Sequence, residues 1–136
     1  MYGKRVMLVE DDNMIRLIFS ETLRRVGVIV IEAENACHAL EQLAKGIRVD
    51  AVITDFSMPG MNGIELAETL GGQYPLMLVS SDNLETEAAK VPAVTKFKQK
   101  PLSPVDLLDG VRNLFTRALE NVTLTNPAPL VAYEQK

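Results

Sequence analysis

Short apolar runs in this sequence end at polar residues whose types suit phosphoryl chemistry. These residues are Glu10, Asp11, Asp12, Asp55, Ser80 and Lys100. Phosphoryl transfer needs a nucleophile, a divalent cation that neutralises developing charge, and a cation and a hydroxyl that hold the remaining oxygens. Carboxylates, a serine and a lysine supply these groups once a metal ion is bound. The set therefore predicts a site that accepts a phosphoryl group.

Asp55 is the predicted nucleophile. Its carboxylate would attack the phosphorus and become an acyl phosphate, as carboxylates do in phosphoryl chemistry. Lys100 would pair with the phosphoryl oxygens as a point charge. Ser80 would donate its hydroxyl to another of these oxygens and move toward the site when phosphate arrives. Taken alone, Lys100 would be a surface lysine and Ser80 a strand-end hydroxyl, so their joint placement carries the prediction.

The acidic residues predict a metal site. Carboxylates brought together repel one another, and a hard divalent cation with oxygen ligands relieves that repulsion. Mg²⁺ is the expected cofactor, and Mn²⁺ is an alternative ion. Asp11 would bind the ion directly and Glu10 through a water, while Asp55 and the backbone carbonyl of Ser57 would complete the protein ligands. Asp12 is expected to be a solvated acid or a helix cap and not a metal ligand, because Asp is favoured at helix N-caps.

The elements that must position these residues alternate along the chain. Apolar runs of strand length occupy 6–9, 28–31, 51–54, 75–79 and 94–97, and helical patterns occupy 13–26, 36–45, 64–70, 83–90 and 103–119. This alternation is typical of βα units built on a parallel sheet. The carboxyl ends of parallel strands meet at one edge, where ligands bind. The sequence therefore predicts an α/β fold, a single doubly wound domain whose polar residues gather at that edge.

The composition limits the classes of function. A chain of 136 residues with 47% hydrophobic content has enough apolar material for one core. The formal net charge of −4 disfavours direct nucleic-acid binding, which depends on clustered Lys and Arg. The single Cys37 forms no intramolecular disulfide, and no apolar run approaches the roughly 18–20 residues that span a bilayer. We therefore expect a cytoplasmic protein with no membrane contact.

The pattern resembles the response-regulator receiver domains of two-component signalling over residues 4–120. The matching motifs are Val-Glu-Asp-Asp at 9–12, Asp-Phe-Ser-Met-Pro-Gly-Met-Asn-Gly at 55–63, Val-Ser-Ser at 79–81 and Lys-Pro at 100–101. The long middle motif is specific, whereas the others would be weak alone. The resemblance implies a flavodoxin-like parallel sheet of five strands in the order 2-1-3-4-5, flanked by five helices. Residues 121–136 lie outside it, and we expect them to form a flexible tail.

The resemblance also implies the roles of individual residues. The family's acidic pair falls on Glu10 and Asp11, and its phosphoacceptor falls on Asp55. Its switch hydroxyl falls on Ser80 and its lysine on Lys100, so the resemblance agrees with the chemistry of the residue types.

Further features of the family fall outside the phosphorylation site. The resemblance implies a cis peptide bond at Lys100–Pro101 and an aromatic rotamer switch at Phe97. The segment between Gly63 and Ser80 is short, and Val91–Val94 replaces the usual Gly-Ala pair. We therefore expect a trimmed third helix or loop and a fourth helix that is short or displaced.

The leading hypothesis is a stand-alone switch that catalyses only its own phosphorylation and dephosphorylation. A sensor histidine kinase or histidine phosphotransfer protein would phosphorylate Asp55, and a downstream protein target would distinguish the two conformations. The face from the fourth to the fifth helix could also form a homodimer. One alternative is a constitutive scaffold with the same fold. Another is an aspartate-nucleophile phosphatase, but such enzymes place a second Asp two residues after the nucleophile, where this chain has Ser57.

Overall fold

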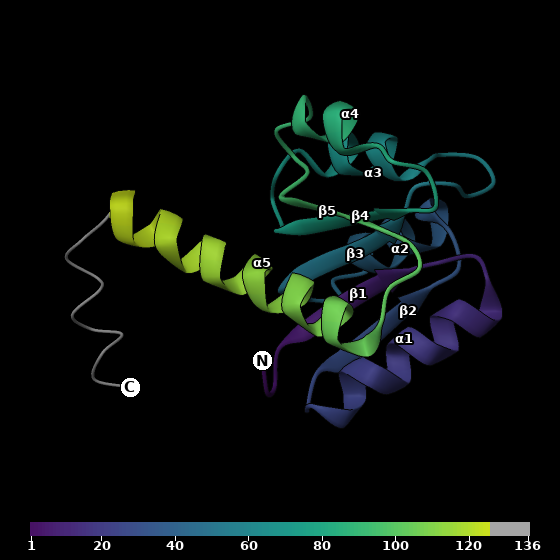
Figure 1. Cartoon of the computed structure of the whole chain (residues 1–136), viewed down its shortest axis with the longest axis horizontal. Helices are drawn as coiled ribbons and strands as arrows, with labels where there is room; N and C mark the ends of the chain where they lie inside the picture. The colour runs from purple at the N-terminus through teal and green to yellow at the C-terminus, as the bar shows by residue number, and fades with distance from the viewer. Residues whose placement is uncertain (126–136) are drawn as a thin grey trace.

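A five-stranded parallel sheet in the order β2-β1-β3-β4-β5 forms the centre of the computed structural model (Figure 1). The structure describes residues 1–125. The strands are β1 (Arg5–Val9), β2 (Ile29–Ala33), β3 (Ala51–Asp55), β4 (Leu76–Ser80) and β5 (Lys96–Gln99). The predicted α/β class and strand order are both confirmed.

Five helices cover the two faces of this sheet (Figure 1). They are α1 (Asn13–Arg25), α2 (Ala36–Ala44), α3 (Gly63–Leu70), α4 (Glu85–Ala89) and α5 (Pro104–Thr125). Helices α1 and α5 lie on one face, and α2, α3 and α4 lie on the other. Within the described part of the chain, no helix combines the length and apolarity needed to cross a bilayer.

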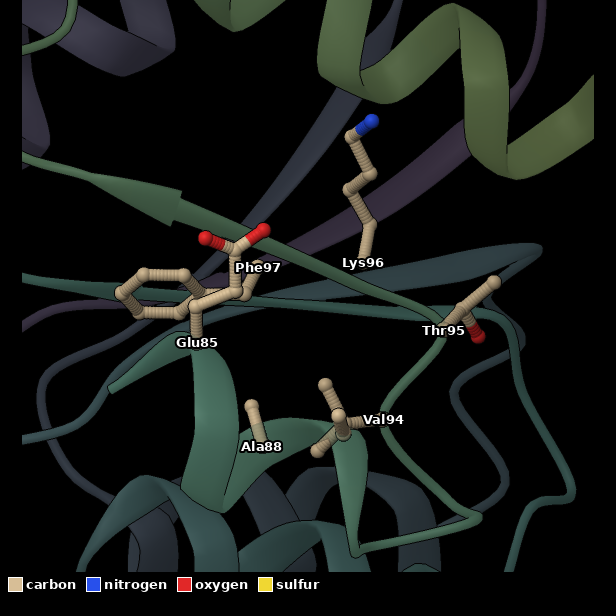
Figure 2. Close-up of a pocket in the computed structure, with 7 residues that line it drawn as sticks. Glu85, Ala88, Val94, Thr95, Lys96 and Phe97 are labelled. Atoms are coloured by element: carbon tan, nitrogen blue, oxygen red, sulfur yellow. The ribbon is translucent and has the colours of Figure 1, made fainter. Parts of the chain in front are cut away.

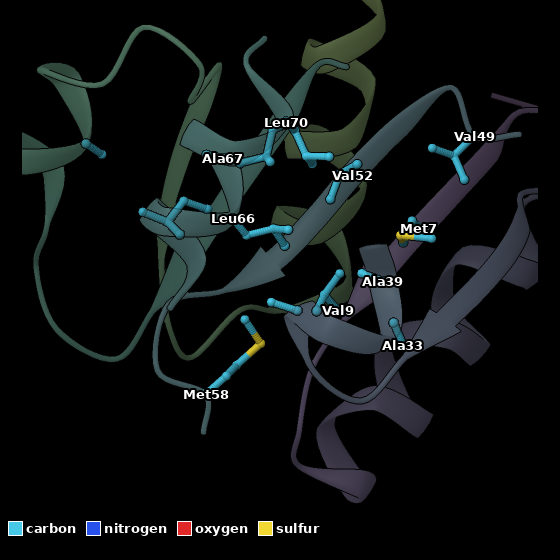
Figure 3. Packing of buried hydrophobic residues seen from close by; sticks show 14 residues of the cluster. Met7, Val9, Ala33, Ala39, Val49, Val52, Met58, Leu66, Ala67 and Leu70 are labelled. Atoms are coloured by element: carbon cyan, nitrogen blue, oxygen red, sulfur yellow. The ribbon is translucent and has the colours of Figure 1, made fainter. Parts of the chain in front are cut away.

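The core has two layers because side chains of a strand point alternately to opposite faces of the sheet. On β1, Val6 and Leu8 pack with residues of α1 and α5 in one cluster. Met7 and Val9 point the other way and pack with residues of α2 and α3 (Figure 3). Both layers are apolar, as expected of a parallel sheet buried on both faces. Polar groups of the central strands are therefore concentrated at the strand ends.

Several predicted boundaries were wrong, including those of β2, β5 and α5. β2 runs to Ala33 and not to Ile31. β5 begins at Lys96 and not at Val94, because the Val94 amide donates a hydrogen bond to the Val91 carbonyl and closes a turn there. Helix α5 continues to Thr125, whereas the helical pattern was expected to end at residue 119. The rest of the expected tail lies outside the described residues.

The expected short fourth helix is present. Helix α4 has five residues. The side chain of its N-cap residue, Leu84, offers no capping bond, and the Glu85 amide donates instead to Oδ1 of Asn83. The third helix has eight residues and ends at Gly71, whose positive φ of 64° is a conformation that glycine adopts readily. The strands β4 and β5, which precede and follow the short α4, are both present.

The loop between β3 and α3 is tightly packed where it returns to the sheet. The Gly63 amide donates a hydrogen bond of 2.9 Å to the Phe56 carbonyl. A Cβ atom at Gly63 would overlap the Asp55 carbonyl oxygen and would lie 2.7 Å from Cδ1 of Leu78. Gly63 therefore lets the first turn of α3 pack against the end of β3, where Asp55 lies.

We expect Gly63→Ala to lower the free energy of unfolding by about 1–3 kcal/mol, because an added methyl group forces the backbone of Asp55 to shift. Urea unfolding measures this change. The control is Glu68→Ala at an exposed position of the same helix, which should stay within about 0.5 kcal/mol of the original chain. Equal unfolding midpoints for the two variants would contradict the proposed packing constraint.

Candidate phosphoacceptor site

Three carboxylates meet at the carboxyl edge of the sheet. Oxygens of Glu10, Asp11 and Asp55 all lie within 4.8 Å of one another. Glu10 follows β1 directly, and Asp55 is the last residue of β3, the neighbour of β1 in the sheet. The side chains of Glu10 and Asp55 are only 3% and 8% exposed, whereas Asp11 is open to solvent. The predicted acidic cluster is thus assembled, with one carboxylate facing outward.

Lys100 neutralises the two buried members of this cluster. Its Nζ lies 3.0 Å from Oε1 of Glu10 and 3.0 Å from Oδ1 of Asp55. The lysine follows β5, and its backbone amide donates a hydrogen bond to the Ser80 carbonyl on β4. The position of Lys100 directly after β5 therefore places its ammonium group beside the two acids.

Burial and Lys100 shift the pKa values of Asp55 and Glu10 in opposite directions. Burial raises the pKa of Asp55, while its hydrogen bond and attraction to Lys100 oppose that rise only in part. Burial also raises the pKa of Glu10, against hydrogen bonds from the Asp12 amide and Lys100. Burial alone would lower the pKa of Lys100, but its bonds to Asp55 and Glu10 outweigh that effect and leave the pKa above its usual value. The site thus has more negative charge than one ammonium group offsets.

The donor set fits a hard divalent cation. Carboxylate oxygens from two neighbouring loops converge at the edge, and the exposed Asp11 offers an approach from solvent. The backbone carbonyl of Ser57 remains a predicted ligand. Asp12 caps α1 as expected, because its Oδ1 accepts hydrogen bonds from the amides of Met14 and Ile15. That carboxylate is therefore engaged with the helix and does not belong to the acidic cluster.

Ser80 ends β4, the neighbour of β3, so it reaches the same edge as Asp55. Its side chain is buried, and its Oγ accepts a hydrogen bond of 3.1 Å from the Asp82 amide. The strand register places Ser80 opposite Gln99, next to Lys100 in sequence. The loop that follows β4 therefore holds the Ser80 hydroxyl. Its strand partner Gln99 directly precedes Lys100 in the sequence.

Phe97 lies on β5, away from the acids. Its half-buried ring lines a cavity of about 370 Å³ between β5 and α4, together with Glu85, Ala88 and Val94 (Figure 2). Figure 2 shows the ring beside the Glu85 side chain at the first turn of α4. The predicted rotamer switch thus adjoins the shortened helix. The expected cis peptide bond at Lys100–Pro101 is also present.

Sequence reasoning missed Arg16. Its Nη1 donates a hydrogen bond of 2.6 Å to the backbone carbonyl of Glu10. Arg16 falls within the first turns of α1, three residues after Asn13, and its type alone gives no sign of a bond to the metal-site loop. The signal was the position of an arginine one helical turn after the acidic motif.

Comparison with known proteins identifies related folds and sequences. The family model described as "Response regulator receiver domain" matches residues 6–112. The putative two-component response regulator ARR21 of Arabidopsis thaliana is 34% identical over 106 residues, which are 75% of this chain but only 17% of that relative. A chemotaxis protein CheY homolog of Campylobacter jejuni is 32% identical over 118 residues, covering 81% of this chain and 91% of the relative.

Solved structures agree with these sequences. The chemotaxis response regulator CheY4 of Vibrio cholerae has a TM-score of 0.74 at 28% identity, over 82% of this chain and 98% of that one. The response regulator protein TrrA of Thermotoga maritima, solved in complex with Mg(2+)-BeF, has a TM-score of 0.73 at 27% identity with the same two coverages. The fold thus recurs in solved response regulators.

We expect Lys100→Met to lower the free energy of unfolding by about 1–3 kcal/mol in metal-free buffer, because two buried carboxylates lose their counter-charge. Urea unfolding at neutral pH measures the loss. Lys90→Met removes an exposed lysine from the end of α4 and should change stability by less than about 0.5 kcal/mol. If both variants unfold at the same urea concentration, Lys100 does not stabilise the acidic cluster.

Proposed function

We propose that this chain, which belongs to the response regulator receiver domain family, is a stand-alone switch phosphorylated on Asp55 in a Mg²⁺-dependent reaction. Receiver domains are switch domains of two-component systems. The observation that carries the proposal is the placement of Asp55 within 3.0 Å of Lys100 and beside the exposed Asp11. The proposed nucleophile, the lysine and the acids that would bind the metal therefore lie together at one edge.

The proposed reaction transfers one phosphoryl group to the chain. A carboxylate oxygen of Asp55 attacks the phosphorus of a phosphohistidine, the P–N bond breaks, and its electron pair leaves with the imidazole. The product is an acyl phosphate on Asp55. Lys100 exchanges part of its contact with Asp55 for a phosphoryl oxygen and continues to neutralise Glu10. Water later hydrolyses the acyl phosphate and restores the carboxylate.

Glu10, Asp11, Asp55 and the Ser57 carbonyl would hold the metal ion in this proposal, with Mn²⁺ as an alternative to Mg²⁺. Bound there, the ion would neutralise charge that develops on the phosphoryl oxygens. Lys100 would supply the second positive charge beside the phosphoryl oxygens. The response regulator TrrA, which has the same fold, was solved in complex with Mg(2+)-BeF, which supports Mg²⁺ as the ion in this proposal.

We infer that the phosphoryl donor is a sensor histidine kinase or a histidine phosphotransfer protein. Its support is an apolar surface on α1 beside the site, where the side chains of Met14, Leu17 and Ile18 are exposed. A groove of about 490 Å³ runs from Ile18 to Lys100 and contains Ser81 and Leu102 in its lining. A helical protein that presents a phosphohistidine has the apolar surface and the reactive group to match.

The downstream target would be a protein that reads the state of α4, β5 and α5, since Ser80 and Phe97 are the proposed switch residues. A homodimer through the same face is the alternative output. We assign the receiver domain to residues 4–120 and a cytoplasmic setting. Direct nucleic-acid binding is not part of this proposal, in keeping with the net charge of −4.

The two competing functions have less support. A constitutive scaffold would not need an assembled acidic cluster with a lysine on two of its members. A phosphatase of the aspartate-nucleophile class would need an acid two residues after Asp55, where Ser57 stands. Both alternatives predict no lasting phosphoryl adduct on this chain.

We expect incubation with acetyl phosphate and Mg²⁺ to add one phosphoryl group, seen by intact-mass spectrometry, and EDTA to prevent it. Asp55→Asn should abolish the adduct because its amide is not a nucleophile of this kind. The matched control is Asp50→Asn, an acid just before β3 that binds the Arg5 amide and lies outside the cluster. A folded chain that gains no adduct and shows no response to beryllofluoride would favour the scaffold.

We expect Ser80→Ala to keep the phosphoryl adduct but to reduce its effect on Phe97, because the hydroxyl that would follow the phosphoryl oxygens is gone. Amide chemical shifts with beryllofluoride and Mg²⁺ measure both parts of this outcome. Ser81→Ala changes the exposed neighbour and should leave the shift at Phe97 unaltered. An undiminished shift of Phe97 in Ser80→Ala would remove Ser80 from the switch.

A further inference from the structure

We propose that Arg16 is a positioning residue that sets the Mg²⁺ affinity of the acidic cluster by fixing the backbone of the β1–α1 loop. The inference rests on the proposed function, because it takes Glu10 and Asp11 as metal-binding residues. Arg16 itself has no carboxylate to offer and acts through the residues that it holds.

Three donors of the Arg16 guanidinium bind three different segments. Nη1 donates to the Glu10 carbonyl at 2.6 Å, and Nη2 donates to Oδ1 of Asn13 at 2.7 Å. Nε donates to Oε1 of Glu32 at 3.2 Å. The Arg16 side chain is only 17% exposed. One planar group therefore joins the end of β1, the start of α1 and Glu32 near the end of β2.

Glu32 provides a rigid anchor for this arrangement. Glu32 pairs with Leu8 in the register of β1 and β2, one residue before the last pair of these strands, after which the acids follow. Its backbone carbonyl accepts a hydrogen bond from Nε2 of Gln42 on α2. The carboxylate that receives Arg16 therefore belongs to an element fixed by the sheet and by a neighbouring helix.

The loop between these anchors contains the metal-binding acids. Glu10 is fixed at its carbonyl by Arg16, at its amide by the Ala33 carbonyl, and at Oε2 by the Asp12 amide. Asp12 is fixed in turn as the cap of α1. Asp11 lies between these two held residues, with its own carboxylate exposed. Groups that orient metal ligands from behind typically change metal affinity by 10–100-fold when removed.

Charge and geometry make opposite predictions for this residue. As a nearby cation, Arg16 would weaken Mg²⁺ binding, so loss of its charge would tighten binding. If its three hydrogen bonds hold the β1–α1 loop in place, Arg16 would strengthen Mg²⁺ binding, and a lysine could not replace it. Lysine keeps the charge but has one ammonium group in place of a planar fork, so it cannot serve all three acceptors in the same directions. Arg16→Lys therefore separates the two effects.

We expect Arg16→Lys to raise the Mg²⁺ dissociation constant about tenfold or more. Amide chemical shifts of the phosphate-free chain, titrated with MgCl₂, measure it without any phosphorylation step. The matched control is Arg24→Lys, since Arg24 binds the other oxygen of Glu32 at 3.0 Å and donates to the Val30 carbonyl, with no bond to the metal-site loop. Its dissociation constant should equal that of the original chain.

Equal Mg²⁺ affinity in Arg16→Lys and the original chain would overturn the positioning role while leaving the proposed function intact. No Mg²⁺ binding by the original chain would overturn both. If urea unfolding shows that Arg16→Lys is not folded, Glu32→Gln decides the matter, because it weakens the anchor of Arg16 and leaves the guanidinium present. Its dissociation constant should rise above that of Arg24→Lys, and equality of those two would also overturn the role.

Discussion

The site depends on one ammonium group placed between two carboxylates that are largely withdrawn from water. Glu10 and Asp55 come from different strands, and each would be costly to bury as an ion without a partner. Lys100 reaches both at 3.0 Å, so the three side chains form one unit in which no member is independent. The third acid, Asp11, is exposed and lacks such a partner among the ion pairs of the described residues. The unit therefore keeps an excess of negative charge, which is the property a divalent cation requires.

The sheet provides the place where these charged side chains can lie together. Its faces are covered by helices, so the strands carry apolar side chains such as Met7 and Leu8 in both directions. The remaining place for charge is the edge where the strands end. Parallel order brings the carboxyl ends of β1, β3, β4 and β5 to one edge, although their residues lie up to 90 positions apart in the sequence. The rigid core thus fixes the spacing of groups that would otherwise repel one another.

The alternation of elements predicted the α/β class and the gathering of the acids at one edge, because both follow from local patterns. The strand order was implied by the resemblance, which the specific motif at 55–63 carries. The sequence did not predict where β5 begins, since Val94 is apolar and β-branched but belongs to a turn closed by Val91. The extent of α5 was also missed, because Val122 and Thr123 have low intrinsic helix propensity and a helix already formed extends at little cost. Arg16 was missed for a different reason. Its position one helical turn after the acidic motif is a weak signal, and its bond to Glu32 on a neighbouring strand forms only in the folded chain.

The short α4 changes what a phosphoryl group on Asp55 would have to do in the proposed switch. A helix of five residues has few internal hydrogen bonds, so its packing on β5 holds it in place. Phe97 and Val94 contribute to that packing from the β5 side, and the cavity between them and Ala88 leaves room for the ring to move. Ser80 lies at the other end of the same β4–α4 connection, bound to the Asp82 amide. A displacement of Ser80 toward the phosphoryl group would break that bond and pull on the segment leading into α4. Because so short a helix has little stability of its own, such a change would reach Phe97 at a smaller free-energy cost than in a long helix.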